Sequence, residues 1–357
     1  MQKKLTPREN VDHDEIRSAA VRENTQKSLD SAVRHFERRF SGQLPATAPM
    51  MELYAQWCVE QGYAMTTIAQ RLTLLARWHR EQGFPDPTTD KSLRDYMKGS
   101  RRKFSRAPKK ASPLTMAHIQ QVVEHCDREI TKATAVLEET DNKAEMREAF
   151  RAQLTALRDK AFFLVGFWFA FRSDELVRLD FESISFEVGQ AHDDGKPCQE
   201  MQISIGSSKG DRESEGRQWR VKELLELCPV NAMLDWQKAL GVINGPVFVK
   251  ISRWGRFSNE PLHVNSVVTL MRKALERAGI DGANFSSHSL RRGFANFAIA
   301  EEMSEKDVMS WVKWTDQRTL HGYIDDSSNL PSKLMDKVRR KRVSLQSDST
   351  RKLQPRQ

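Results

Sequence analysis

The sequence is poor in cysteine and lacks any long apolar run. Its four cysteines, Cys58, Cys126, Cys198 and Cys228, lie at least 30 residues apart, so neither a zinc site nor a C-x-x-C redox motif is expected. The most apolar run, Ala161–Phe171, has 11 residues, whereas a membrane span needs about 20. The first 24 residues are polar throughout and do not resemble a secretory signal. These features predict a cytoplasmic protein with reduced thiols and no membrane partner.

The motifs that usually bind nucleotides are also missing. The sequence contains no GxxxxGK[ST] loop, no GxGxxG fingerprint and no internal repeat. It has no cluster of carboxylates at metal-ligand spacing, which argues against a metal hydrolase built on His288 and His321. We therefore expect no metal and no cofactor.

The positive charge is concentrated at the two ends of the chain. The formal net charge is +9, but residues 1–110 carry +8, residues 111–330 carry −6 and residues 331–357 carry +7. Seven basic residues and no acid occupy positions 98–110, namely Lys98, Arg101, Arg102, Lys103, Arg106, Lys109 and Lys110. A polyanion is the expected partner, because neutralised phosphates release condensed counterions. The alternative is a solubilising linker or a targeting tract.

The length of 357 residues predicts two domains. We expect a flexible arm over residues 1–20, a helical domain over 21–104, a basic linker over 105–113 and a second domain over 114–330, followed by a helix over 331–343 and a basic tail over 344–357. In the first domain, 3.6-residue periodicity predicts helices over about 24–40, 50–61, 66–82 and 91–104. The helix over 50–61 is expected to bury Leu53 and Trp57, with Cys58 as a further candidate. The helix over 66–82 presents Arg71 and Arg77 on a polar face, which is a ligand-binding face or simply a solvated one.

The second domain mixes helices with a short β region. Helical patterns cover the segment after Thr115 and residues 142–171, and a period of two begins near Phe181. Residues 201–205 and 219–221 flank the polar segment 206–216 as the strands of a hairpin. Helical patterns return at 230–240, 264–278, 289–300, 304–312 and 315–323. The fold expected is mainly α, with a small antiparallel β-sheet in the C-terminal domain.

Two basic residues stand out at the start of the helix over 289–300. His288 and Arg291 are three residues apart, so both project from one helix face. This pair suits a phosphodiester, because arginine can hold nonbridging oxygens bidentately and histidine exchanges a proton near neutral pH. An unremarkable helix start is the alternative.

Further candidates lie elsewhere in the second domain. Arg172 directly follows an apolar run and is held rigidly, either for charge stabilisation or as a structural partner of Glu175. Lys209 lies in the hairpin loop, where it can reach a ligand or be a plain surface lysine, and the same hairpin offers Arg212, Arg217 and Arg220 as alternative basic residues. Trp314 and Tyr323 stand nine residues apart across a short helix, where Tyr323 can equally be a packing residue.

Taken together, these residues resemble the tyrosine recombinase family, also called phage integrases. The resemblance rests on type, order and spacing: Arg172 with Glu175, then Lys209, then His288-x-x-Arg291, then Trp314, then Tyr323. Trp314 stands where many members have His, as in Cre-like members, and Val312-Lys313 replaces the common Leu-Gly before it. The resemblance implies a two-domain C-shaped DNA clamp, made of a helical core-binding domain and an α+β catalytic domain.

The resemblance also implies a mechanism. Tyr323 attacks a DNA phosphodiester, which forms a 3′-phosphotyrosyl bond and releases a 5′-hydroxyl without ATP or a metal. His288 is the implied general base and Lys209 the implied general acid. Arg172 and Arg291 hold the nonbridging oxygens, Trp314 donates its indole N–H to the phosphate or packs against it, and Glu175 holds the arginines.

The implied partner is double-stranded DNA with inverted-repeat recombination sites, in the nucleoid or host-cell DNA. The chain is expected to bind one site as a dimer and to form a tetrameric synapse that passes through a Holliday junction. The helix over 331–343 would dock into the neighbouring subunit. Three alternatives remain: a type IB topoisomerase, a telomere resolvase or related transposase, and a catalytically silent DNA-binding regulator.

Overall fold

The computed structural model describes residues 23–105, 111–189, 198–206 and 217–323. The chain divides into two compact units between Lys109 and Lys110, within the segment for which the sequence predicts a linker. No helix in the described ranges is long and apolar enough to cross a membrane. Several predictions concern residues outside these ranges: the arm over 1–20, Arg106, Lys109, Lys110, Lys209, the helix over 331–343 and the tail over 344–357.

Within residues 23–105, the first unit has four helices and one short 3₁₀ turn. These are α2 (Glu23–Arg39), α3 (Ala48–Glu60), α4 (Met65–Glu81), η1 (Pro87–Thr89) and α5 (Lys91–Phe104). The side chain of Asp90 accepts the Ser92 N–H at 2.8 Å and so begins α5, which has the bounds that the sequence predicts. Phe36, Tyr54 and Ile68 are fully buried in the core between the helices.

The predicted buried face of α3 is partly wrong. Leu53 is 57% exposed, whereas Met51, Tyr54 and Cys58 of the same helix are fully buried. Because apolar residues occur all around this helix, periodicity alone does not decide which stripe faces the core. Trp57 is half-buried and packs against the edge of that core.

In its described residues the second unit is mainly helical with two small antiparallel sheets, which confirms the predicted fold class. Its helices are α6 (Met116–Glu139), α7 (Lys143–Trp168), α8 (Ser173–Val177), η2 (Phe181–Ser183), α9 (Pro229–Leu240), α10 (Val264–Arg277), η3 (Gly282–Asn284), α11 (Ser289–Ala300), α12 (Glu305–Val312) and α13 (Gln317–Tyr323). The strands are β1 (Ile184–Gly189), β2 (Cys198–Ile205), β3 (Arg217–Lys222), β4 (Val249–Ile251) and β5 (Phe257–Pro261). The first three form a sheet in the order β1-β2-β3, and β4 pairs with β5. The β4–β5 pair was not predicted, because its strands are short and lack a clear period.

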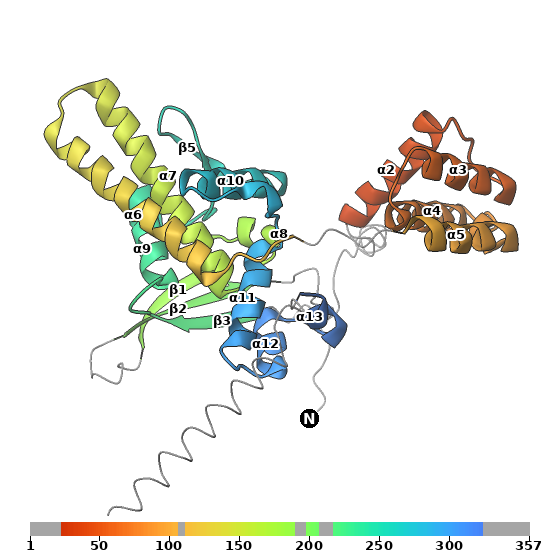
Figure 1. The fold of residues 1–357 in the computed structure, drawn as a ribbon. Coiled ribbons are helices and arrows are strands. Elements are labelled where there is room, and N and C mark those ends of the chain that lie inside the picture. Colours follow the sequence, from red (N-terminus) through yellow and green to blue (C-terminus); the bar gives the residue numbers. More distant parts are fainter. Residues whose placement is uncertain (1–22, 106–110, 190–197, 207–216, 324–357) are drawn as a thin grey trace, which may run out of the picture. The chain divides into compact units, whose positions relative to one another are not determined.

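The helices α7 and α11 contact each other, and between them they contact α6, α9, α12 and α13. Figure 1 shows α6 and α7 side by side as a helical hairpin, with α11, α12 and α13 next to one another at the other end of the unit. Gly166 of α7 lets α11 approach closely, because a Cβ at this position would lie 2.8 Å from the Leu290 side chain. The backbone at Leu114 runs along the start of α11, where its N–H donates to the Ser289 carbonyl at 3.0 Å. The first contact holds the end of α7 against the start of α11, and the second holds the segment before α6 against the same helix start.

Candidate active site

The carboxylate of Glu175 is the hub of the candidate site. One of its oxygens, Oε2, accepts the backbone N–H of Arg172 at 2.8 Å, and the other, Oε1, accepts Nη1 of the Arg172 guanidinium at 2.8 Å. The bond to the backbone N–H caps the first turn of α8, and the bond to the guanidinium is an ion pair. One carboxylate therefore serves both the helix start and the charge of Arg172. The Glu175 side chain is only 4% exposed, while Arg172 is half-buried.

Arg291 reaches the same carboxylate from α11. Its Nη1 lies 3.7 Å from Glu175 Oε2 and donates to the Ala170 carbonyl at 2.7 Å, and its Nη2 donates to the Val312 carbonyl at 2.7 Å. The guanidinium also lies 5.2 Å from the ring centre of Trp314. Burial, reinforced by the charge of Arg172, lowers the pKa of Arg291 to about 10. Arg291 therefore stays charged at neutral pH, in a place where water is excluded.

The hydroxyl of Tyr323 lies 2.9 Å from His288 Nδ1. In the tautomer with Nδ1 unprotonated, the phenol donates this hydrogen bond. The Tyr323 ring also packs against the ring of Trp314, with centroids 4.8 Å apart. Partial burial lowers the pKa of His288, and the charges of Arg291 and Arg172 lower it further. A neutral imidazole thus faces the phenol at neutral pH.

A residue that the sequence analysis did not choose joins this group. Arg217, at the start of β3, places Nη1 3.5 Å from Glu175 Oε1, and its side chain is 10% exposed. A signal was present, because Arg217 lies two residues before the buried Trp219 and therefore on the same face of the strand. The sequence offered Arg217 only as one of several basic residues of the hairpin, and Lys209 was favoured over it.

An open cleft of about 630 Å³ adjoins the group. It is lined by Arg172, Ser173, Asp174, Val264, Asn265, Val268, Ser287 and His288. Among the residues that the structure describes, no group of three or more His, Cys, Asp or Glu side chains could hold a metal ion.

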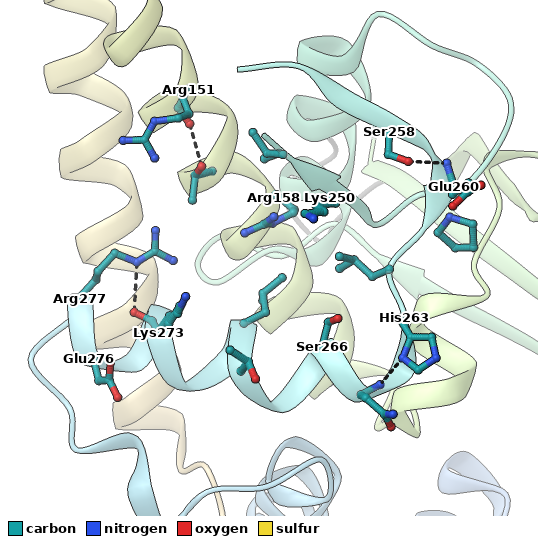
Figure 2. Close-up of a pocket in the computed structure, with 17 residues that line it drawn as sticks. Arg151, Arg158, Lys250, Ser258, Glu260, His263, Ser266, Lys273, Glu276 and Arg277 are labelled. Atoms are coloured by element: carbon teal, nitrogen blue, oxygen red, sulfur yellow. Dashed lines mark hydrogen bonds between the residues drawn. The ribbon is translucent and has the colours of Figure 1, made fainter. Parts of the chain in front are cut away.

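A second, larger cleft of about 1040 Å³ lies between α7, α10 and the β4–β5 pair (Figure 2). Five cationic residues line it: Arg151 and Arg158 from α7, Lys250 from β4, and Lys273 and Arg277 from α10. Buried Asp159 accepts Nη2 of Arg158 at 2.8 Å and pairs with Arg277 through its other oxygen. Two exposed acids, Glu260 and Glu276, also line the cleft.

The structure brings six of the seven predicted catalytic residues together. These are Arg172, Glu175, His288, Arg291, Trp314 and Tyr323, and the seventh, Lys209, falls outside the described ranges.

The predicted DNA contacts of the first unit differ in their surroundings. Lys98, Arg101, Arg102 and Lys103 are all exposed on α5. By contrast, Arg71 lies over the ring of Tyr63, 4.4 Å from its centre, and Arg77 is paired with Glu81 at 2.6 Å. As DNA contacts, all six residues remain predictions.

Known proteins resemble this chain in sequence. It is 25% identical over 339 residues to an integrase/recombinase XerD homolog of Selenomonas ruminantium, covering 88% of this chain and 90% of that protein. It is 26% identical over 278 residues to tyrosine recombinase XerD of Xanthomonas axonopodis pv. citri, covering 71% and 85% of the two chains.

Solved structures share the fold. A lambda integrase dimer bound to a COC′ core site matches with a TM-score of 0.52 and 14% identity, over 88% of this chain and 93% of that one. XerH recombinase bound to a palindromic difH substrate matches with a TM-score of 0.52 and 14% identity, over 83% and 75% of the two chains. The sequence profile of the phage integrase family matches residues 136–329. The chain is therefore a member of the phage integrase family, the tyrosine recombinases.

Proposed function

We propose that this recombinase cuts and rejoins DNA through a covalent bond between Tyr323 and a 3′-phosphate. One observation carries the proposal: the Tyr323 hydroxyl lies 2.9 Å from His288 Nδ1, beside two guanidiniums that share Glu175. A nucleophile, a base and preorganised positive charge thus lie within one group. The XerD homologs support the same reaction class.

The step has a simple balance of bonds and protons. The Tyr323 oxygen attacks phosphorus, its proton passes to His288, and the bond from phosphorus to the 5′-oxygen breaks. The leaving oxygen takes up a proton, for which Lys209 remains the predicted donor. Arg172 and Arg291 offset the charge that develops on the nonbridging oxygens, a role that metal ions fill in other phosphoryl-transfer enzymes. The phosphotyrosyl bond conserves the energy of the broken bond, so rejoining needs no ATP.

We place double-stranded DNA with inverted-repeat sites in the role of partner, in the nucleoid or host-cell DNA of the cytoplasm. The lambda integrase dimer on a core site and XerH on a palindromic substrate support a dimer on one site. Exchange between two sites then requires four protomers and a Holliday junction. The C-shaped clamp and the docking helix over 331–343 remain predictions within this proposal.

The large cleft of Figure 2 suits the DNA backbone next to the scissile phosphate. Asn265 lines both this cleft and the smaller one beside His288, so the two clefts adjoin. Within the described part of the chain, Arg151, Lys250 and Lys273 form no ion pair. The five cations of the cleft outnumber its two acids, Glu260 and Glu276, so its lining favours an anion, and phosphates are the anions that this proposal supplies.

Replacing Tyr323 by Phe removes the nucleophile and keeps the ring that packs on Trp314. We expect wild-type protein to form a covalent adduct without added metal on a nicked suicide duplex selected from random DNA. Tyr323→Phe should form none, measured as a shifted protein band on a denaturing gel. An adduct that persists in Tyr323→Phe would refute the assignment. Recombinant products from two duplexes would separate strand exchange from the simple resealing of a topoisomerase.

The rate of adduct formation should fall as the pH drops through the pKa of His288. Because that pKa lies below the ordinary 6.5, the imidazole remains an unprotonated acceptor at neutral pH, and the loss occurs only below about pH 6.5. Single-turnover cleavage between about pH 5 and pH 8 measures this acid limb. The His288→Gln variant should cleave more slowly, and its cleavage rate should not show this fall at acid pH. A limb with its midpoint above 6.5, or one retained in His288→Gln, would contradict the role of His288.

The Lys250→Gln/Lys273→Gln variant tests the basic cleft. If each lysine neutralises one phosphate, the slope of log affinity against log salt should be shallower than wild type by about 1.8, at about 0.9 per contact. Fluorescence anisotropy on a random 30-base-pair duplex gives this slope. The matched control is Lys143→Gln/Lys238→Gln, which changes two exposed lysines on α7 and α9 outside the cleft. Equal slopes for the two double variants would remove the cleft from the DNA interface.

A further inference from the structure

Three guanidiniums, rather than two, converge on Glu175. Oε1 of this carboxylate lies 2.8 Å from Arg172 Nη1 and 3.5 Å from Arg217 Nη1, and Oε2 lies 3.7 Å from Arg291 Nη1. The carboxylate is 4% exposed, so water screens these charges weakly. One negative charge therefore faces three positive charges, and the group carries a net charge of +2.

The position of Arg217 is fixed by its strand. Residue Arg217 pairs with Ile205 of β2, and its face of β3 continues with Trp219. The Trp219 indole donates to the Trp311 carbonyl at 2.9 Å and packs edge-on against Phe171 with centroids 5.0 Å apart. These contacts anchor the strand two residues beyond Arg217. The guanidinium is thus directed at Glu175 by a packed sheet rather than by a chance surface contact.

The contact with Glu175 leaves most N–H donors of Arg217 without a hydrogen-bond partner among the described residues. A guanidinium carries five N–H donors, and within the described residues Arg217 makes one hydrogen bond, the long one to Glu175. Its charge is felt at the site, because it contributes to the lowered pKa of Arg291. Like charges brought together in this way raise the free energy of the empty site, and an anion bound there relieves that cost.

We propose that Arg217 is a positioning residue of the recombination reaction. It shares the Glu175 carboxylate with Arg172 and Arg291, which sets the direction of both guanidiniums, and it adds a third positive charge to the field at the scissile phosphate. This inference rests on the proposed function and extends it to a residue outside the resemblance to the family.

Arg217→Met tests this inference, because it keeps the aliphatic stem and removes the charge. We expect adduct formation on a phosphodiester suicide duplex to slow by about tenfold or more, as for the loss of one preorganised donor. Arg217→Lys should recover part of the rate, since it restores the charge without the planar fork. The matched control is Arg220→Met on the same strand, where the side chain is 58% exposed and hydrogen-bonds Gln202 instead.

A second substrate separates an electrostatic role from a structural one. Replacing one nonbridging oxygen of the scissile phosphate by methyl removes the negative charge that the third guanidinium would stabilise. On this methylphosphonate duplex, Arg217→Met and wild type should cleave at rates within about threefold of each other. The inference is overturned if Arg217→Met matches wild type on the phosphodiester, or if it is equally slow on both substrates. If wild type forms no Tyr323 adduct at all, the proposed function fails instead.

Discussion

The catalytic part of this protein depends on one buried carboxylate. Glu175 is 4% exposed and lies between guanidiniums that come from three different segments of the chain. Without that negative charge, Arg291, at 2% exposure, would be a buried cation whose remaining contacts are two backbone carbonyls and the Trp314 ring. A buried charge that loses its partner is strongly destabilising, so the arginines and the carboxylate are expected to be retained or lost together. The stability of the unit thus depends on the same charges that the proposed function assigns to phosphate binding.

The fold brings the residues around Glu175 together from separate helices. Arg172 and Glu175 lie at the start of α8, His288 and Arg291 lie at the start of α11, and Tyr323 is the last residue of α13. Close packing joins these elements, because Gly166 allows α11 to approach α7, and buried Leu320 holds α13 in the core. Packing in the hydrophobic core therefore brings residues that are far apart in the sequence into one group. The large basic cleft adjoins this frame through α10, which explains why one helix lines both clefts.

Much of this arrangement could be predicted from the sequence. Helices with strong periodicity and clear ends, such as α5 and α11, have the bounds expected of them, because caps and apolar stripes act locally. The six residues that gather at the candidate site were also identified, since the family resemblance depends on residue type and order. Local patterns fail where tertiary packing decides, as in α3, where Leu53 faces outward and Tyr54 inward. They fail again at Arg217, whose role depends on a partner 42 residues away in the sequence.

The free energy of unfolding of Glu175→Gln tests the central role of this carboxylate most directly. This variant keeps the shape and one acceptor oxygen of the side chain but removes its charge, which leaves three guanidiniums without a counter-charge. The unfolding transition of the C-terminal unit should lose about 3 kcal/mol, the size expected when one partner of a buried ion pair is removed. Added sulfate should restore more of that loss in the variant than it adds to wild type. Stability unchanged to within about 0.5 kcal/mol, the usual range for surface substitutions, would contradict the account.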